Sequence, residues 1–317
     1  MSVQLSRTGQ TDVYMTGEPK VTLFSSVYTR HTPFLKQYIE VPFNNNVSNI
    51  PVSFTAISDL PFSGDFITDI CLKATGPATT TSSFTEARLM VGNHKISTVT
   101  GAYLSMLEDT MIPVENQPGF IVLNTTPGLL KLEFGLKNLP VCCLQLNEIT
   151  VEIDFVASSG ITAASLLVEY AYVGERELNW FQSTKQRIVY RSLKYNSYSL
   201  VKGKNTLNIT GTIPGPVQRL YMVASGTGIT NISILLCGQV LLDYSSDYYN
   251  LIEIYENAAV TPTSNVFMYT FKDAINFSRI SEILLSVTTT QSLSLTLNAE
   301  TLNVFVADNG LGCFVFL

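Results

Sequence analysis

The chain has 317 residues, which is enough for one large domain or two domains of roughly 150 residues. Only 14% of the residues are charged, against roughly 25% in an average soluble protein, and 63 are serine or threonine. Large subunit interfaces are depleted in charge in this way, so we expect other subunits to cover much of the folded surface. The sequence also excludes a membrane-spanning helix, because glycine and polar residues interrupt the longest uncharged run, between Arg219 and Asp243.

The first residues and the cysteines indicate the compartment. Residues 1–10 contain no apolar segment of the kind found in signal peptides, so we expect folding in a cytosol-like compartment. The five cysteines are odd in number, two are adjacent, and none forms a C-x-x-C pair. We therefore expect buried free thiols, and neither disulfides nor metal ligands, at Cys71, Cys142, Cys143, Cys237 and Cys313.

Most of the first half has the composition and the periodicity of short strands. β-Branched and aromatic residues are frequent, several segments alternate apolar with polar residues, and clusters of Gly, Pro, Asn and Ser separate them. One short amphipathic helix is predicted over 101–110, where Tyr103, Met106 and Leu107 share a face. We predict strands over residues 20–30, 37–43, 51–57, 66–74, 129–136, 149–157 and 165–173.

The second half follows the same pattern after a short predicted helix over 174–186. A further helix is predicted over 247–257, where Tyr248, Leu251, Ile252 and Tyr255 share a face. The remaining predicted strands cover residues 205–211, 217–225, 231–236, 265–271, 280–288, 292–299, 302–307 and 312–317.

The order of these elements repeats. Each half contains a strand, a glycine turn (Gly92 or Gly238), a second strand and a short amphipathic helix. We interpret this as two β-domains of the same plan, each an eight-stranded sandwich, joined by the helix at 174–186.

The sequence offers little for catalysis. It has two histidines, His31 and His94, and contains no metal-binding cluster, phosphate-binding loop or nucleophile elbow. The acidic pair Glu152 and Asp154 alternates with apolar residues, which places both on the solvent side of a strand. A sugar-binding β-sandwich module remains an alternative, with Trp180, Tyr248 and Tyr249 as candidate stacking residues.

One long stretch lacks acidic residues. Between Leu178 and Leu242 there is no Asp or Glu. The stretch is either a basic face for an acidic partner, such as lipid headgroups or a neighbouring subunit, or a set of cations on the outer side of strands. The residues of this possible basic face are Lys185, Arg187, Arg191, Lys194, Lys202 and Lys204.

Several motifs together resemble one family. The segment "DVYMTGEPKVTLFSSVYTRHTPF" (12–34) is similar to the N-terminal signature of the double jelly-roll major capsid proteins of nucleocytoplasmic large DNA viruses. "RLMVGNHKIS", "LPVCCLQLNEITVEIDF", "LLVEYAYVGERELNWF", "NFSRISEILLSV" and "LNVFVADNGLGCFVF" resemble further family motifs, in the same order along the chain. The matching positions that we single out as structural are Gly17, Pro19, Tyr28, Arg30, His31, Gly92, Arg176, Phe181, Asn276, Phe277, Ser278 and Arg279.

The resemblance implies an all-β fold of two consecutive eight-stranded antiparallel jelly rolls with a few short helices. Its expected parts are an N-terminal arm (1–19), a first roll (20–173), a linking helix (174–186) and a second roll (187–317). In that fold 20–30 is the first strand of the first roll, and His31 at its end has a structural role. The chain is shorter than most members of the family, so we expect the long loops that build outward towers to be trimmed. We expect the Pro- and Asn-rich loops at 76–83 and 113–128 to lie at the trimer seams or on the outer surface.

The resemblance also implies a function without enzymatic activity or cofactors. A capsid protein of this kind forms homotrimers, which act as pseudo-hexagonal capsomers of an icosahedral shell in the virion, assembled in the host cytoplasm. Expected partners are further copies, minor capsid and penton proteins, and an internal viral membrane, but no specific nucleic-acid sequence. Because the chain is short, a minor capsid protein or an assembly scaffold remains open.

Overall fold

The computed structural model describes residues 34–45, 53–75, 83–110, 128–157, 161–257, 265–308 and 310–314. Residues 36–317 form one compact unit. The signature residues Gly17, Pro19, Tyr28, Arg30 and His31 lie outside the described residues, as does the strand expected over 20–30.

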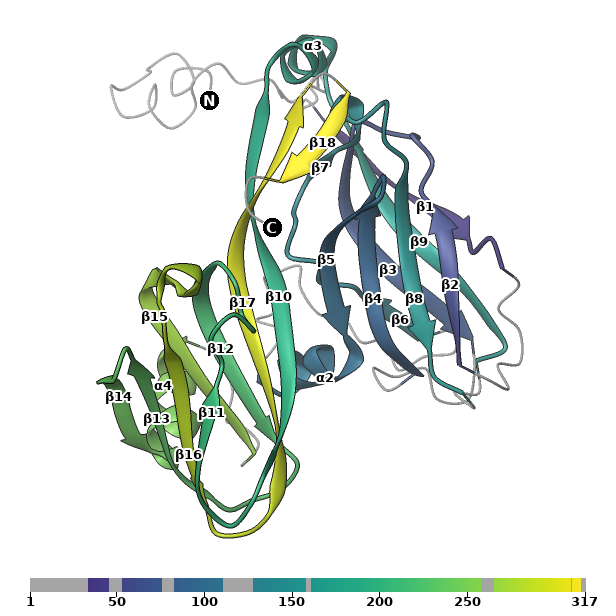
Figure 1. Ribbon diagram of the computed structural model, residues 1–317. Coiled ribbons are helices and arrows are strands. Elements are labelled where there is room, and N and C mark those ends of the chain that lie inside the picture. Colours follow the sequence, from purple (N-terminus) through teal and green to yellow (C-terminus); the bar gives the residue numbers. More distant parts are fainter. Residues whose placement is uncertain are drawn as a thin grey trace, which may run out of the picture. The chain divides into compact units, whose positions relative to one another are not determined.

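The first half folds into two antiparallel sheets (Figure 1). One has the order β1-β9-β3-β6, with β7 beside β3, and the other has the order β2-β8-β4-β5. Helix α2 (Gly101–Thr110) follows β5, and the short 3-10 helix η2 (Val141–Cys143) follows β7. The strands are β1 (Leu35–Pro42), β2 (Phe54–Asp59), β3 (Phe66–Thr75), β4 (Phe84–Val91), β5 (His94–Thr100), β6 (Gly128–Lys131), β7 (Leu139–Pro140), β8 (Ile149–Phe155) and β9 (Ala163–Tyr172).

Helix α3 (Glu175–Ser183) leads into the second half, which also forms two antiparallel sheets. Their orders are β10-β17-β12-β15, with β18 beside β17, and β11-β16-β13-β14. The strands are β10 (Gln186–Leu200), β11 (Gly203–Asn208), β12 (Pro216–Ala224), β13 (Ile229–Leu236), β14 (Gln239–Ser245), β15 (Val266–Asn276), β16 (Ile283–Thr289), β17 (Leu293–Asp308) and β18 (Leu311–Phe314). The helical segments are the π-helix η3 (Tyr248–Ile252), α4 (Glu253–Asn257) and the 3-10 helix η4 (Phe277–Arg279).

The two halves have the same topology. If β7 and β18 are set aside and the remaining strands of each half are numbered one to eight, both halves give the sheet orders 1-8-3-6 and 2-7-4-5. This is the jelly-roll arrangement of two Greek keys. The predicted fold of two consecutive eight-stranded jelly rolls is therefore confirmed in the described part of the chain.

Alternating burial explains why these segments form strands around a core. In β8, Ile149, Val151, Ile153 and Phe155 are buried, while Thr150, Glu152 and Asp154 between them are half-buried on the outer side. A strand with this period buries one face against the opposite sheet. On the outer side, the Arg88 guanidinium binds both acids, at 2.9 Å from Glu152 Oε2 and 2.6 Å from Asp154 Oδ2.

Two details differ from the predictions. The strands predicted over 292–299 and 302–307 are one continuous strand, β17, because it pairs along its whole length with β10. The strand predicted over 129–136 ends at Lys131, and the chain then follows an irregular path to β7.

The expectation of buried thiols is only partly correct. All five cysteines are free, and Cys71, Cys142 and Cys143 are buried. Burial raises the pKa of the Cys71 and Cys142 thiols to about 12. The prediction is wrong for Cys237 and Cys313, which are exposed because one lies in the turn after β13 and the other on the edge strand β18.

The halves also share two irregularities of register. The β3–β9 pair shifts at Thr68 and the β12–β17 pair shifts at Gln218, so that Asp69 lies opposite Glu169 and Arg219 lies opposite Glu300. The β4–β5 pair skips Ile96 and the β13–β14 pair skips Leu241. Because bulges fix the register on either side of them, they allow positions of one roll to be matched with positions of the other.

Candidate functional site

A buried polar contact joins the two rolls. The Tyr103 hydroxyl on α2 donates a hydrogen bond of 2.7 Å to Glu300 Oε1 on β17, and the Tyr221 hydroxyl on β12 donates to the same oxygen at 3.2 Å. The two tyrosine rings lie 6.0 Å apart in an edge-to-face arrangement. Burial, reinforced by the nearby Glu300 carboxylate, raises the pKa of Tyr103 well above its ordinary value, which keeps this hydroxyl a donor.

A second junction lies where the irregular segment before β7 meets β10. The Arg191 amide donates to the Gly135 carbonyl at 3.3 Å, and a Cβ on Gly135 would stand 2.0 Å from the Arg191 carbonyl oxygen. Nearby, the Tyr190 hydroxyl donates to the Ile96 carbonyl at 3.1 Å. One hydrophobic cluster accordingly runs from the first roll to Tyr190, Leu193, Tyr221 and Phe305 of the second, so the rolls are packed together in the single chain.

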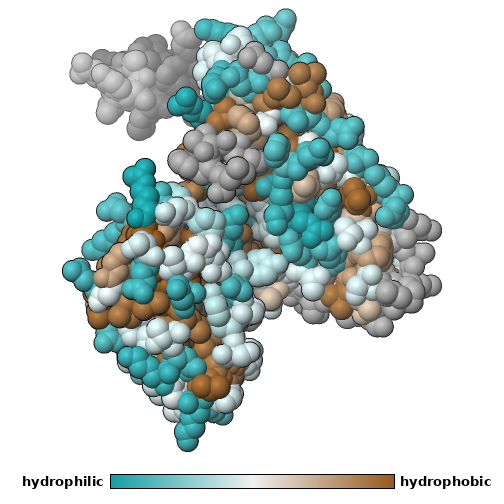
Figure 2. Space-filling model, in the orientation of Figure 1, coloured by the Kyte–Doolittle hydropathy of each residue, from teal (hydrophilic) through white to brown (hydrophobic). Residues whose placement is uncertain are grey.

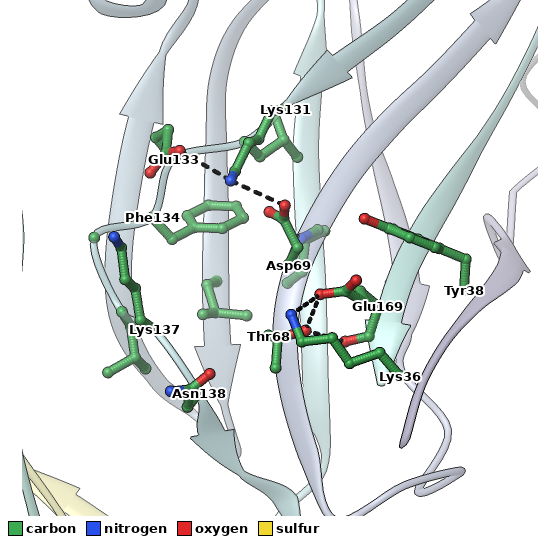
Figure 3. A pocket seen from close by; sticks show the side chains of 15 residues that line it. Lys36, Tyr38, Thr68, Asp69, Lys131, Glu133, Phe134, Lys137, Asn138 and Glu169 are labelled. Atoms are coloured by element: carbon green, nitrogen blue, oxygen red, sulfur yellow. Dashed lines mark hydrogen bonds and ion pairs between the residues drawn. The ribbon is translucent and has the colours of Figure 1, made fainter. Parts of the chain in front are cut away.

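The first roll carries an open pocket of about 260 Å³ on the outer face of the β1-β9-β3-β6 sheet (Figure 3). Lys36 Nζ lies 2.8 Å from Glu169 Oε2, which also accepts a hydrogen bond from the Thr68 hydroxyl. Lys131 Nζ lies 2.9 Å from Asp69 Oδ2 and 3.3 Å from Glu133 Oε1. Other side chains around the pocket include Tyr38, Phe134, Lys137 and Asn138.

The charges of the pocket floor are held by these pairs. Burial raises the pKa of Glu169, but the hydrogen bonds from Lys36 and Thr68 outweigh it and leave the pKa below its ordinary value. Burial likewise lowers the pKa of Lys131, and its contacts with Asp69 and Glu133 more than reverse this effect. Both groups are therefore charged near neutral pH.

The predicted structural residues in the described part occupy three separate places. Gly92 lies in the turn between β4 and β5 with a φ of +56°, which favours glycine. Arg176 is exposed in the first turn of α3. Phe181 packs edge-to-face on Phe66 at 4.9 Å, and its carbonyl accepts a hydrogen bond of 3.2 Å from the Cys143 thiol, so it fixes α3 to the first roll.

The "NFSR" motif forms a local clasp. The Asn276 side chain accepts a hydrogen bond from the Ser278 amide at 3.1 Å, and the Ser278 hydroxyl accepts one from the Gly215 amide at 2.7 Å. Phe277 is buried, and its amide donates to the Gly215 carbonyl at 3.0 Å. Arg279 is exposed at the end of this turn. These contacts tie the end of β15 to the start of β12, which is a structural role.

The residues of the possible basic face differ in their burial and in their contacts with acidic groups. Lys185 lies 3.2 Å from Asp308, and Arg191 lies 3.9 Å from Glu300. Lys194 is half-buried, and burial together with the nearby Lys95 lowers its pKa. Arg187, Lys202 and Lys204 are exposed on β10, in the following turn and on β11. These contacts favour the interpretation of cations on the outer side of strands.

The residues considered for sugar stacking do not form a platform. Tyr249 is fully buried and its hydroxyl donates to the Ile232 carbonyl at 3.0 Å. Tyr248 is half-buried and stacks on Tyr244, while Trp180 lies on α3 against Phe181. Within the described ranges there is no group of three or more His, Cys, Asp or Glu residues that could hold a metal ion, and no helix meets the length and hydropathy needed to cross a membrane.

An exposed apolar surface lies on the second roll. Figure 2 shows apolar side chains gathered over the strands of this roll among hydrophilic ones. β14 is the edge strand of its sheet and most of its side chains are exposed. We call the following exposed residues of β14, η3 and α4 the β14–α4 surface: Val240, Leu241, Tyr244, Leu251, Ile252 and Tyr255. Exposed apolar residues on an edge strand and the adjoining helix make this part of the second roll a candidate surface for binding another protein.

Sequence reasoning missed the roll junction and the pocket. The sequence places Tyr103 only on the apolar face of a helix, and it places Glu300 in the gap between the strands predicted over 292–299 and 302–307. The matched bulges that align Glu169 with Glu300 leave no mark in residue type. One signal is present in Glu169, the single charged residue of the otherwise mostly apolar segment 165–173.

Comparison with known proteins places this geometry in context. No family model matches the chain. The major capsid protein of Pyramimonas orientalis virus is 25% identical over 314 residues, which cover 83% of this chain and 77% of that protein. Capsid protein 1 of Acanthamoeba polyphaga mimivirus is 23% identical over 70% of this chain, and the alignment spans about half (48%) of that relative's length.

Among solved structures, the PBCV-1 virus capsid matches with a TM-score of 0.75 at 16% identity, over 93% of this chain and 100% of that one. A structural match at this low identity shows a shared fold. The relationship in sequence rests on the two capsid proteins named above. The resemblance indicated by the sequence motifs is thereby confirmed. The chain is a double jelly-roll protein that is related in sequence to the major capsid proteins of large DNA viruses.

Proposed function

We propose that this protein is a structural capsid protein whose homotrimers act as the pseudo-hexagonal capsomers of an icosahedral shell. The observation that carries the proposal is the repetition of one jelly-roll topology within a single chain. Three copies then present six similar rolls around one axis, so one gene product supplies a nearly six-fold unit. The named relatives are capsid proteins and not enzymes, which supports a structural role.

The composition supports extensive burial between copies. Only 14% of the residues are charged, and the β14–α4 surface exposes several large apolar side chains. Obligate assemblies bury about 2,000 Å² or more and have apolar centres, whereas contacts between whole capsomers would be smaller and more polar. The rolls themselves are held together within the chain by the Tyr103–Glu300 contact, so each copy enters the trimer as one piece.

The expected boundaries and partners belong to this proposal. The N-terminal arm is 1–19, the first roll is 20–173, the link is 174–186 and the second roll is 187–317. The assembled protein would be located in the virion shell, built in the host cytoplasm. Neighbouring capsomers, minor capsid and penton proteins and an internal viral membrane would be its partners. The exposed Arg187, Lys202 and Lys204 are candidates for contact with an acidic partner.

The test is quantitative mass spectrometry of purified virus particles, combined with immunogold labelling of the same particles. We expect the chain among the most abundant particle proteins, with the label on the shell. A chain that is absent from purified particles and occurs only in lattices on membranes of infected cells would be an assembly scaffold, and the proposal would then be wrong.

A further inference from the structure

The contact between α2 and the second roll occurs at a definable position of the jelly roll. Tyr103 of α2 reaches Glu300, which lies opposite Arg219 beside the bulge at Gln218. The matched bulge in the first roll lies at Thr68, where Asp69 lies opposite Glu169. The first roll therefore has its own version of the surface that α2 covers in the second roll.

That equivalent surface is the pocket of Figure 3. Thr68, Asp69 and Glu169, the counterparts of Gln218, Arg219 and Glu300, all line it. In the second roll this position is closed by a tyrosine from the helix of the other roll. In the first roll the same position is an open pocket of about 260 Å³, and within the described part of the chain no helix closes it.

The helix of the second roll that corresponds to α2 exposes side chains at positions that α2 buries. In each roll this helix follows a hairpin with the same bulge, β4–β5 before α2 and β13–β14 before η3 and α4. Counted from the two turns, Met106 and Leu107 correspond to Leu251 and Ile252. The first two are 3% and 4% exposed, whereas their counterparts are 52% and 50% exposed.

We infer that the η3–α4 helix of one copy docks in the first-roll pocket of a second copy, at the position that α2 covers in the second roll of its own chain. The Tyr103 hydrogen bond itself is not repeated, because the counterpart of Tyr103 is Tyr248, whose hydroxyl donates to Glu253. The inference rests on the proposed function, because it names the surfaces through which the copies associate. Tyr255, 87% exposed, is the most accessible aromatic residue of this helix.

Charge and symmetry agree with this occupant. Asp247 just before the helix and Glu256 within it are exposed acids. In the pocket, Lys36 and Lys131 are paired with Glu169, Asp69 and Glu133, so the exposed Lys137 at the rim is the cation that these acids would meet. Helix and pocket are different surfaces on different rolls, so a single contact between them is heterologous. A heterologous contact of this kind closes into a ring when the rotation allows it, as a trimer requires.

Sedimentation equilibrium of the full chain tests the inference with two exposed substitutions. Tyr255→Ala removes the aromatic side chain from the helix, and Lys137→Glu reverses the charge at the pocket rim. We expect each substitution to weaken trimer formation at least tenfold. Each variant chain should still unfold at the same temperature as the wild-type monomer, which would show that the fold itself is intact. Val201→Ala, at an exposed apolar position in the turn after β10, is the matched control and should leave association unchanged.

Mixing the two variants distinguishes this contact from any symmetric one. The Tyr255→Ala chain keeps an intact pocket and the Lys137→Glu chain keeps an intact helix, so the mixture should form heterodimers that neither variant forms alone. Trimers of unchanged affinity in both variants would overturn the inference and leave the proposed trimer standing. A wild-type chain that stays monomeric would instead overturn the proposed function.

Discussion

Tyr103 and Glu300 lie in different jelly rolls, and the tyrosine hydroxyl donates a hydrogen bond of 2.7 Å to the buried carboxylate. Tyr221 is the second hydroxyl donor to the same oxygen. A buried carboxylate is costly unless its hydrogen-bond donors are in place. The burial of Glu300 therefore depends on α2 being packed against the second roll, because α2 supplies the shorter of the two hydrogen bonds.

Replacing Tyr103 with Phe tests that dependence. The ring stays, but Glu300 loses its shorter hydrogen bond while it remains buried, and we expect a loss of about 1 to 3 kcal/mol in the free energy of unfolding. Tyr195→Phe is the matched exposed control, since its hydroxyl donates to Glu86 of the first roll at 2.9 Å and its loss should cost under about 1 kcal/mol. Urea unfolding measures both. Equal losses would mean that burial gives the Tyr103–Glu300 contact no extra weight over an exposed contact between the rolls.

A second prediction concerns the backbone contact between the rolls. In Gly135→Ala the new Cβ would stand 2.0 Å from the Arg191 carbonyl oxygen, at a residue whose φ is +72°. Neither the backbone of β10 nor this turn can move without breaking the Arg191–Gly135 hydrogen bond, so we expect a loss of about 3 kcal/mol or more. Gly174→Ala, with no neighbouring atom within 4 Å, should change stability little. A mild effect of Gly135→Ala would show that the rolls are not held at this point.

The glycines of the two hairpin turns allow the cost of backbone strain to be measured separately from the cost of steric crowding. Gly92 and Gly238 both have positive φ, but a Cβ on Gly92 would stand 2.7 Å from Asn147 Nδ2, whereas one on Gly238 would meet nothing within 4 Å. Gly238→Ala should cost about 1 to 2 kcal/mol from backbone strain alone. Gly92→Ala should cost more, because Asn147 Oδ1 accepts the Gly312 amide and would be displaced. Thermal unfolding of the two variants checks this order, and the reverse order would contradict it.

Stability should fall in acid partly through Glu169. Its pKa is lower in the folded chain than in the unfolded one, so the carboxylate adds stability above the unfolded value, about 4.3. That contribution is lost as the pH falls through the lower folded pKa. Glu169→Gln should therefore flatten the dependence of unfolding free energy on pH below about pH 4.3, measured by urea unfolding at a series of pH values. An unchanged dependence would show that the Lys36 and Thr68 contacts do not act on this carboxylate.

The fold could be predicted from the sequence because its signals are local. Alternation in segments such as 149–155, together with Gly, Pro and Asn turns, marks most strands, and the helix expected over 101–110 has the same bounds as α2. The repeat of element order gave the two-roll plan. The ends of a strand could not be predicted where they depend on hydrogen bonding to a neighbouring strand. β17 is continuous because β10 supports all of it, which no property of residues 300 and 301 reveals.

The junction and the pocket could not be predicted, because they depend on contacts between residues far apart in the chain. Tyr103 and Glu300 are separated by 197 positions, and their meeting follows from the packing of two complete rolls. Gly92 shows the opposite case, since a glycine in a hairpin turn was expected and its positive φ explains it. Cys237 and Cys313 show that residue type alone is a poor guide to burial in turns and on edge strands.

The central claim is that this two-roll chain completes its surface with further copies of itself. The most direct measurement is the mass of the purified protein in solution, by sedimentation equilibrium at micromolar concentration. We predict a species of three times the 34.9 kDa chain mass. A stable species of 34.9 kDa that persists as the concentration is raised would contradict the account.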